Sequence, residues 1–172
     1  MIALINYCVF YLKEGWIGLA GTPEGLLKIT LPQKYREYAE AIIKKQFSCI
    51  ECSETGFKNA VIQLTEYFLG SRYSFSLALD FRATSQFARS VLEAVKEIPY
   101  GEVRTYAEIA SIIGNPKSSR AVGQALKCNP FPIVVPCHRV VASRGELGGF
   151  SGGLELKRYL LEMEKKFKMD VY

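Results

Sequence analysis

The sequence predicts a fold in two parts: a small α/β unit over residues 1–82, with an antiparallel sheet and helices, and a mostly helical unit over residues 83–172. The first half mixes strand-like apolar runs with helical spacing, whereas helical spacing dominates the second half. The chain has 172 residues, of which 49% are hydrophobic. This length and composition suit one large core or two small ones.

Five segments of the first half carry a pattern. The apolar stretches 1–12 and 16–21 flank a short turn and predict paired strands. Apolar residues recur at helical spacing in residues 33–47, and residues 60–70 predict a second helix that ends at its glycine. Residues 73–81 alternate apolar and other side chains, which predicts a strand with one buried face.

The second half contains four helical patterns. Residues 84–98 and 154–167 each have one apolar face, and residues 105–114 open with the capping box Thr105 to Glu108. A tight Gly-Asn-Pro turn joins the helix of residues 105–114 to a basic helix within residues 115–129. Two short helices joined in this way are typical of a helix-turn-helix, although ordinary helical hairpins share the pattern.

Prolines exclude a helix interior from the next segment, residues 130–142. Within it, "IVV" (133–135) and "RVVA" (139–142) are β-type sequences. "SRGELGGFSGG" (143–153) predicts a glycine-rich loop. We therefore expect two short strands and a loop before the last helix.

Charge is distributed unevenly along the chain. The net charge is +5, and all of it lies in residues 82–172, because residues 1–81 carry eight basic and eight acidic side chains. A local basic excess attracts polyanions, although a solvated basic face would look the same. The chain has no apolar run of the ~18 residues that a membrane span needs. We expect a soluble cytoplasmic protein, associated with the nucleoid if the source is prokaryotic.

The five cysteines do not predict a disulfide framework, because their number is odd and the N-terminus lacks the features of an export signal. Cys49 and Cys52 form a CxxC pair, which is compatible with a redox motif, half a zinc site, or two ordinary cysteines. Without a second CxxC or a nearby histidine, the ordinary reading is favoured. A disulfide between them stays open.

The only histidine of the chain, His138, follows Cys137 directly in an apolar run. The pair offers two metal ligands where zinc needs three or four, so the remaining readings are a buried structural cysteine and an activated nucleophile. In an extended strand the two side chains would point to opposite faces. A functional pair therefore needs a bent backbone, which Pro136 would favour, or a bridging water.

Four segments together resemble one family in order and spacing: "IPYGEVRTYAEIA", "GNPKSSRAVGQAL", "CNPFPIVVPCHRVV" and "FSGGLELKRYLLEME". They are similar to the O6-alkylguanine-DNA alkyltransferases over residues 85 to 164, while the first 80 residues resemble the family only in general form. The resemblance implies a ribonuclease-H-like N-terminal unit and a helix-turn-helix that binds double-stranded DNA containing O6-alkylguanine. It also implies base flipping and irreversible transfer of the alkyl group to Cys137, by a monomer without a cofactor.

The resemblance also implies the roles of the site residues. His138, oriented by Glu164, would deprotonate Cys137 through a water, and Asn129 would brace the turn. Tyr106 would be both catalytic and substrate-binding, because its hydroxyl and the Ser151 backbone amide would donate hydrogen bonds to the leaving guanine. Leu126 and Phe150 would be apolar walls of the pocket, and Val140 would offer a backbone carbonyl to the substrate. The implied DNA-binding residues are Arg120, Ala121, Gly123, Lys127 and Arg139, with Arg120 filling the gap left by the flipped base.

The transfer is an SN2 displacement at carbon, for which a thiolate is the best protein nucleophile. Some relatives hold a structural zinc in their N-terminal half, but no histidine precedes His138 here, so we expect no metal site. Two other functions are weighed. A non-catalytic protein or regulator that binds alkylated DNA would not need Cys137, and a cysteine hydrolase would turn over repeatedly.

Overall fold

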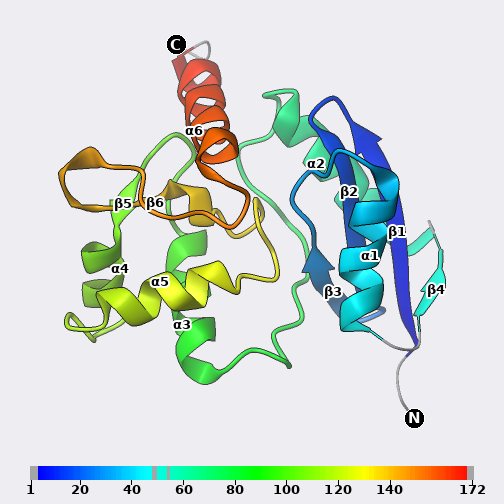
Figure 1. The fold of residues 1–172 in the computed structure, drawn as a ribbon, viewed down its shortest axis with the longest axis horizontal. Helices are drawn as coiled ribbons and strands as arrows, with labels where there is room; N and C mark the ends of the chain where they lie inside the picture. Colours follow the sequence, from blue (N-terminus) through cyan, green and yellow to red (C-terminus); the bar gives the residue numbers. More distant parts are fainter. Residues whose placement is uncertain (1–3, 48–49, 54, 170–172) are drawn as a thin grey trace. The chain divides into compact units, whose positions relative to one another are not determined.

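The computed structural model describes residues 4–47, 50–53 and 55–169. The chain divides into two compact units, Met1–Ala83 and Thr84–Tyr172 (Figure 1). The first contains a small sheet with helices and the second is mostly helical, as the sequence predicts. Among the described residues, no helix combines the length and the apolar character that crossing a membrane requires.

The first unit is built on a four-stranded sheet with the order β3-β2-β1-β4. Strands β1 (Ile5–Leu12) and β2 (Gly15–Thr22) form the antiparallel pair that the sequence predicts, and β3 (Gly25–Ile29) adds antiparallel to β2. The short strand β4 (Ile50–Cys52) instead runs parallel to β1. The sheet is therefore mixed, and the expectation of a purely antiparallel sheet is wrong, because a helical crossover separates β3 from β4.

Helix α1 (Arg36–Gln46) packs against strands β1 and β2 (Figure 1). Its buried residues Ala39 and Ile43 share a hydrophobic cluster with side chains of the sheet: Tyr7, Val9 and Ala20. A Cβ atom at Gly18 would lie 3.0 Å from Cγ1 of Ile43, so this glycine allows the helix to approach the sheet closely. Helix α2 (Lys58–Phe68) follows the short 3₁₀ turn η1 (Thr55–Phe57). Both helices occur where the apolar spacing predicts them.

Residues 73–81 form an extended segment but not the strand that the sequence predicts. Their only pairing among the described residues is at Leu79, which forms a parallel bridge with Leu26 of β3. The amide of Leu26 donates to the carbonyl of Ala78 at 2.9 Å. The alternation itself is real, because Phe75, Leu77 and Leu79 are less exposed than the residues between them.

In the second unit, helices α3 (Gln86–Lys96), α4 (Tyr106–Ile112) and α5 (Ser119–Lys127) pack on one another, and α6 (Leu154–Met169) is the last helix. Each of these four helices corresponds to a predicted one. The predicted capping box of α4 is present, since Thr105 and Glu108 bond each other's backbone amides.

Between α4 and α5 the chain turns at Gly114, whose φ of 73° is in the left-handed region. The amide of Asn115 then donates to the carbonyl of Ala110 at 2.9 Å. Ser118 occupies the N-cap position of α5, although its side chain does not bond the helix amides. The two helices are therefore consecutive, tightly connected and in contact, as the sequence predicts.

The strand expected at residues 133–135 is wrong. Ile133 has a φ of 76°, and the amide of Val135 donates to the carbonyl of Phe131 at 2.8 Å, so this segment is a tight buried turn. The next segment is partly β: strand β6 (Val140–Val141) pairs in parallel with β5 (Arg104–Thr105). Between residues 133–135 and β6, Cys137–Arg139 forms the 3₁₀ turn η2.

Candidate active site

Cys137 and His138 lie in the turn η2 and are both buried, with exposed fractions of 5% and 0%. The Cys137 amide donates to the Val135 carbonyl at 2.8 Å, and the Arg139 amide donates to the Pro136 carbonyl at 2.9 Å. A 3₁₀ turn has three residues per turn, so consecutive side chains are not on opposite faces as they are in a strand. The bent backbone that a functional pair needs is therefore present.

Asn129 holds the turn that precedes the cysteine. Its Nδ2 donates to the Val135 carbonyl at 3.0 Å, and its Oδ1 accepts from the Phe131 amide at 2.9 Å. Burial raises the pKa of the Cys137 thiol, and a hydrogen bond from the Asn129 side chain and the charge of Lys157 act in the opposite direction. Cys137 is therefore held as a thiol at rest, close to groups that favour its ionised form.

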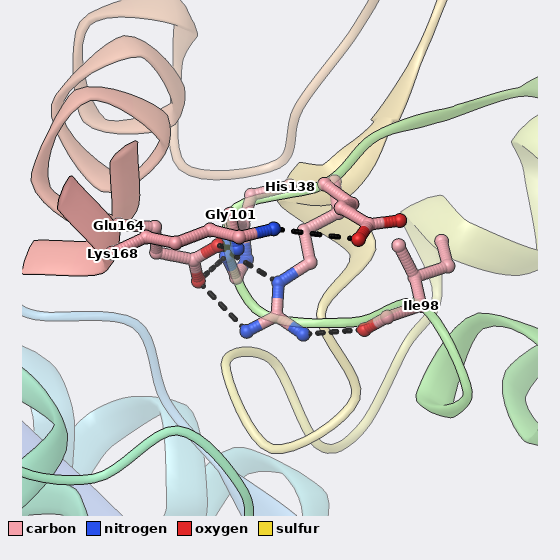
Figure 2. A network of polar contacts seen from close by, with 7 residues as sticks. Ile98, Gly101, His138, Glu164 and Lys168 are labelled. Atoms are coloured by element: carbon pink, nitrogen blue, oxygen red, sulfur yellow. Dashed lines mark hydrogen bonds and ion pairs between the residues drawn. The ribbon is translucent and has the colours of Figure 1, made fainter. Parts of the chain in front are cut away.

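His138 is paired with Glu164 of α6. Nε2 of His138 lies 2.7 Å from Oε1 of Glu164. Figure 2 shows both residues within one network of polar contacts. Burial lowers the pKa of His138, so the ring is neutral near pH 7. Burial alone would raise the pKa of Glu164, but hydrogen bonds from His138 and Arg139 and the positive charge of Arg139 lower it to about 2. A carboxylate can only accept, so we assign the imidazole proton to Nε2, which leaves the lone pair on Nδ1.

The expectation that Arg139 contacts DNA is wrong. The residue is 5% exposed, and its Nε and Nη2 atoms each donate to Glu164 at 2.9 Å. Its Nη1 donates to the Ile98 carbonyl at 2.6 Å, and Glu164 also accepts from the Gly101 amide at 3.1 Å (Figure 2). The sequence-based prediction counted Arg139 as surface charge, but its nitrogens neutralise the carboxylate that holds His138.

A pocket of about 390 Å³ opens above Cys137. Besides the cysteine, four residues predicted to bind substrate line it: Tyr106, Leu126, Phe150 and Ser151. Two residues predicted to contact DNA, Gly123 and Lys127 of α5, line it as well. The structure therefore brings the predicted nucleophile and most of the predicted substrate residues to one cavity. Val140 does not line it and is buried in β6.

Tyr106 contacts the glycine-rich loop at this pocket. Its hydroxyl donates to the Gly149 carbonyl at 3.2 Å. A Cβ atom at Gly148 would lie 3.0 Å from Cε2 and 3.1 Å from the hydroxyl oxygen of Tyr106, and Gly148 has a φ of +66°. The ring therefore occupies space that any other residue at Gly148 would fill.

Lys157 of α6 is a residue of the site that the sequence-based prediction missed. It is 0% exposed, and its Nζ donates to the carbonyls of Val140, Leu147 and Gly149. Burial lowers its pKa from 10.5 to about 8, and the nearby Cys137 acts in the opposite direction. A signal was present in the sequence: Lys157 is three residues before the apolar Leu160 and seven before Glu164, which places it on the inward face of the helix.

The exposed side of α5 carries the remaining residues predicted to contact DNA. Arg120, Ala121 and Lys127 are exposed, and Gly123 is partly exposed. Arg120 is the second residue of the helix. Small side chains beside a basic one leave this surface open to a polyanion.

No group of three or more His, Cys, Asp or Glu side chains within residues 4–47, 50–53 and 55–169 is arranged to hold a metal ion. Cys49 lies outside the described residues, so its predicted alternatives, including a disulfide with Cys52, are not addressed by the structure.

Comparison with known proteins agrees with this arrangement. The family described as "6-O-methylguanine DNA methyltransferase, DNA binding domain" matches residues 86–166. The methylated-DNA–protein-cysteine methyltransferase of Methanosarcina acetivorans is 45% identical over 158 residues, which are 92% of this chain and 97% of that protein. The protein of the same name from Methanosarcina barkeri is 42% identical over 154 residues, 88% of this chain and 91% of its own.

A solved structure is similar over both units. The crystal structure of Mycobacterium tuberculosis OGT in complex with DNA has a TM-score of 0.82 and 39% sequence identity, and the match covers 94% of each chain. Sequence similarity therefore extends over nearly the whole chain, and a fold match accompanies it. The chain belongs to the methylated-DNA–protein-cysteine methyltransferase family.

Proposed function

We propose that this protein repairs DNA by moving the alkyl group of O6-alkylguanine in duplex DNA onto Cys137, once per protein molecule. One observation carries the proposal. Cys137 lines a pocket of about 390 Å³, and it is followed in the chain by His138, whose Nε2 is bonded to the buried carboxylate of Glu164. A non-catalytic DNA-binding protein would not need this arrangement. The methyltransferase relatives favour transfer over binding alone.

The proton of Cys137 leaves first. Glu164 fixes the His138 proton on Nε2, so Nδ1 is the basic atom of a neutral imidazole. We propose that Nδ1 takes the thiol proton through one water, and that the imidazolium formed is stabilised by Glu164. Because burial raises the pKa of the thiol, little thiolate exists before the substrate enters, and other electrophiles react slowly.

The thiolate then attacks the alkyl carbon. One S–C bond forms and the C–O6 bond breaks, with its electron pair passing to the guanine. The guanine anion then takes up a proton from water, and the His138 imidazolium returns one to solvent. That leaving group needs hydrogen bonds to the charge it develops. We propose that the Tyr106 hydroxyl and the Ser151 amide supply them, and that the Tyr106 hydroxyl leaves the Gly149 carbonyl to do so. The S-alkylcysteine has no carbonyl for water to attack, so Cys137 is not regenerated.

DNA binding is proposed to occur at α4 and α5 as a helix-turn-helix. The exposed face of α5 carries Arg120 and Lys127 with small residues between them, which suits close approach to the narrow minor groove. Arg120 would fill the gap left by the flipped base and offset part of the few kcal/mol that unstacking costs. We expect little sequence preference. The ribonuclease-H-like description of the first unit stays a prediction.

The experiment is a comparison of wild type and Cys137→Ser on a duplex with one O6-methylguanine. We expect the wild type to clear one lesion per protein molecule and the serine variant to clear none, while both bind the duplex with similar affinity. Serine has a much higher pKa than cysteine and is a poorer nucleophile toward carbon. Continued clearance beyond one lesion per molecule would indicate a hydrolase instead.

A further inference from the structure

Lys157 is an unusual residue for the interior of a protein, since a lysine is almost never fully buried unless it is paired. It is 0% exposed, and it lies on α6 seven residues before Glu164. An unpaired buried ammonium is costly, so its position has to be explained by what surrounds it.

Three backbone carbonyls surround the ammonium. Nζ donates to Val140 at 2.6 Å and to Gly149 at 3.3 Å, and it makes a short contact with the Leu147 carbonyl. An ammonium has three N–H donors, so these acceptors match its capacity. All three are neutral, and the positive charge of Lys157 is therefore not cancelled by these contacts.

The contacts join two segments that adjoin the residues of the pocket. Val140 follows the turn that carries Cys137, whereas Leu147 and Gly149 belong to the loop whose next residues, Phe150 and Ser151, line the cavity. The Gly149 carbonyl accepts from Lys157 and also from the Tyr106 hydroxyl. A single ammonium thus fixes the loop against the strand beside the nucleophile.

The charge acts on the same nucleophile. Lys157 opposes the effect of burial on the pKa of Cys137, and Cys137 in turn raises that of Lys157. The other titratable groups around the thiol are Tyr106 from α4 and His138 from η2, and behind the histidine stand Arg139 and Glu164. Arg139 is paired with Glu164, and Lys127 of α5 lines the same pocket but is exposed. Lys157 is therefore the buried cation whose charge acts on the sulfur.

We propose that Lys157 is a positioning residue of this reaction: its buried ammonium holds the pocket loop to β6 and supports the negative charge that forms on the sulfur of Cys137. It lines no part of the cavity, so it acts through Cys137 and the loop rather than on the alkyl group. The proposal rests on the proposed function, in which Cys137 accepts the alkyl group.

The test is the pH dependence of single-turnover methyl transfer by Lys157→Met, which keeps the length of the side chain and removes its charge. We expect the rate near pH 7 to fall roughly tenfold or more and the whole pH profile to move to higher pH, because removing a nearby cation disfavours the thiolate. The matched control is Lys165→Met on the exposed face of the same helix, which should leave the transfer rate and its pH profile unchanged. Site-resolved alkylation of Cys137 by iodoacetamide, followed by peptide mass spectrometry, should show the same displacement without DNA.

A folded Lys157→Met protein with the wild-type pH profile would overturn the inference but leave the proposed function standing. Wild-type protein that never acquires a methyl group on Cys137 would instead overturn the proposed function. If the Lys157→Met variant does not fold, the proposal is tested on the wild-type protein before and after methylation. Methylation of Cys137 abolishes the ionisation that raises the pKa of Lys157, so the titration of the Lys157 side chain, followed by NMR, should move to lower pH. An unchanged titration would contradict the proposal.

Discussion

The Nε2 atom of His138 lies 2.7 Å from Oε1 of Glu164, and both side chains are fully buried. This contact determines which imidazole nitrogen carries the proton and which carries the basic lone pair. Replacing Glu164 by Gln keeps the shape but offers either an acceptor or a donor. We expect Glu164→Gln to slow methyl transfer roughly hundredfold, within the range of general-base effects. Single-turnover kinetics measures this.

The affinity of Glu164→Gln for the lesion duplex should stay within about twofold of wild type, because Glu164 is fully buried. A transfer rate equal to that of wild type would show that the histidine needs no carboxylate.

The same carboxylate makes stability depend on pH. The pKa of Glu164 is about 2 in the folded protein and 4.5 as a reference for the unfolded chain. A depressed carboxyl pKa stabilises the fold above the unfolded value, and the contribution is lost as pH falls from about 4.5 to 2. Its full size is about 3 kcal/mol. Urea unfolding across this window should show the loss in wild type and a shallower dependence in Glu164→Gln, whereas parallel curves would contradict the assignment.

Arg139 and Arg120 should behave as opposites. Arg139→Met leaves the buried Glu164 without its main cation, and breaking such a pair costs about 3–5 kcal/mol of unfolding free energy. Arg120→Ala removes an exposed side chain, so stability should change by less than about 0.5 kcal/mol while DNA affinity falls. Denaturant unfolding and DNA binding on both variants check this. A stable Arg139→Met protein with weakened DNA binding would restore the DNA-contact role for Arg139.

Two glycines of the same loop region give a matched pair. Gly148→Ala would place a Cβ atom 3.0 Å from the Tyr106 ring, whereas Gly145→Ala would meet nothing within 4 Å, and both positions have positive φ. The backbone strain is therefore shared, and only Gly148→Ala displaces Tyr106. We expect similar losses of stability but slower transfer in Gly148→Ala alone. Equal transfer rates in the two variants would remove Tyr106 from the mechanism.

The sequence predicts the helices well because their signals are local. The Thr105–Glu108 capping box and the apolar faces of α3 and α6 are confirmed where they were expected. The strand predictions failed where tertiary context decides. Residues 133–135 have β-type side chains, but the Asn129 side chain holds the chain in a turn there.

The site was partly predictable for the same reason. The pair Cys137 and His138 is conspicuous in the sequence, and its environment is not. Arg139 was counted as a surface charge because nothing in its immediate neighbours predicts its burial, and Lys157 was not singled out although its helical spacing places it on the inward face. Burial of a charged residue depends on partners distant in sequence. Glu164 is that partner for Arg139, and the Leu147 and Gly149 carbonyls are the partners of Lys157.

The most direct test of the central claim is peptide mass spectrometry of the protein after reaction with duplex DNA in which the O6-methyl group is isotopically labelled. The account predicts one labelled methyl group per protein molecule, located on Cys137, with unmodified guanine left in the DNA. Label on any other residue, or loss of the lesion while the protein stays unlabelled, would contradict it.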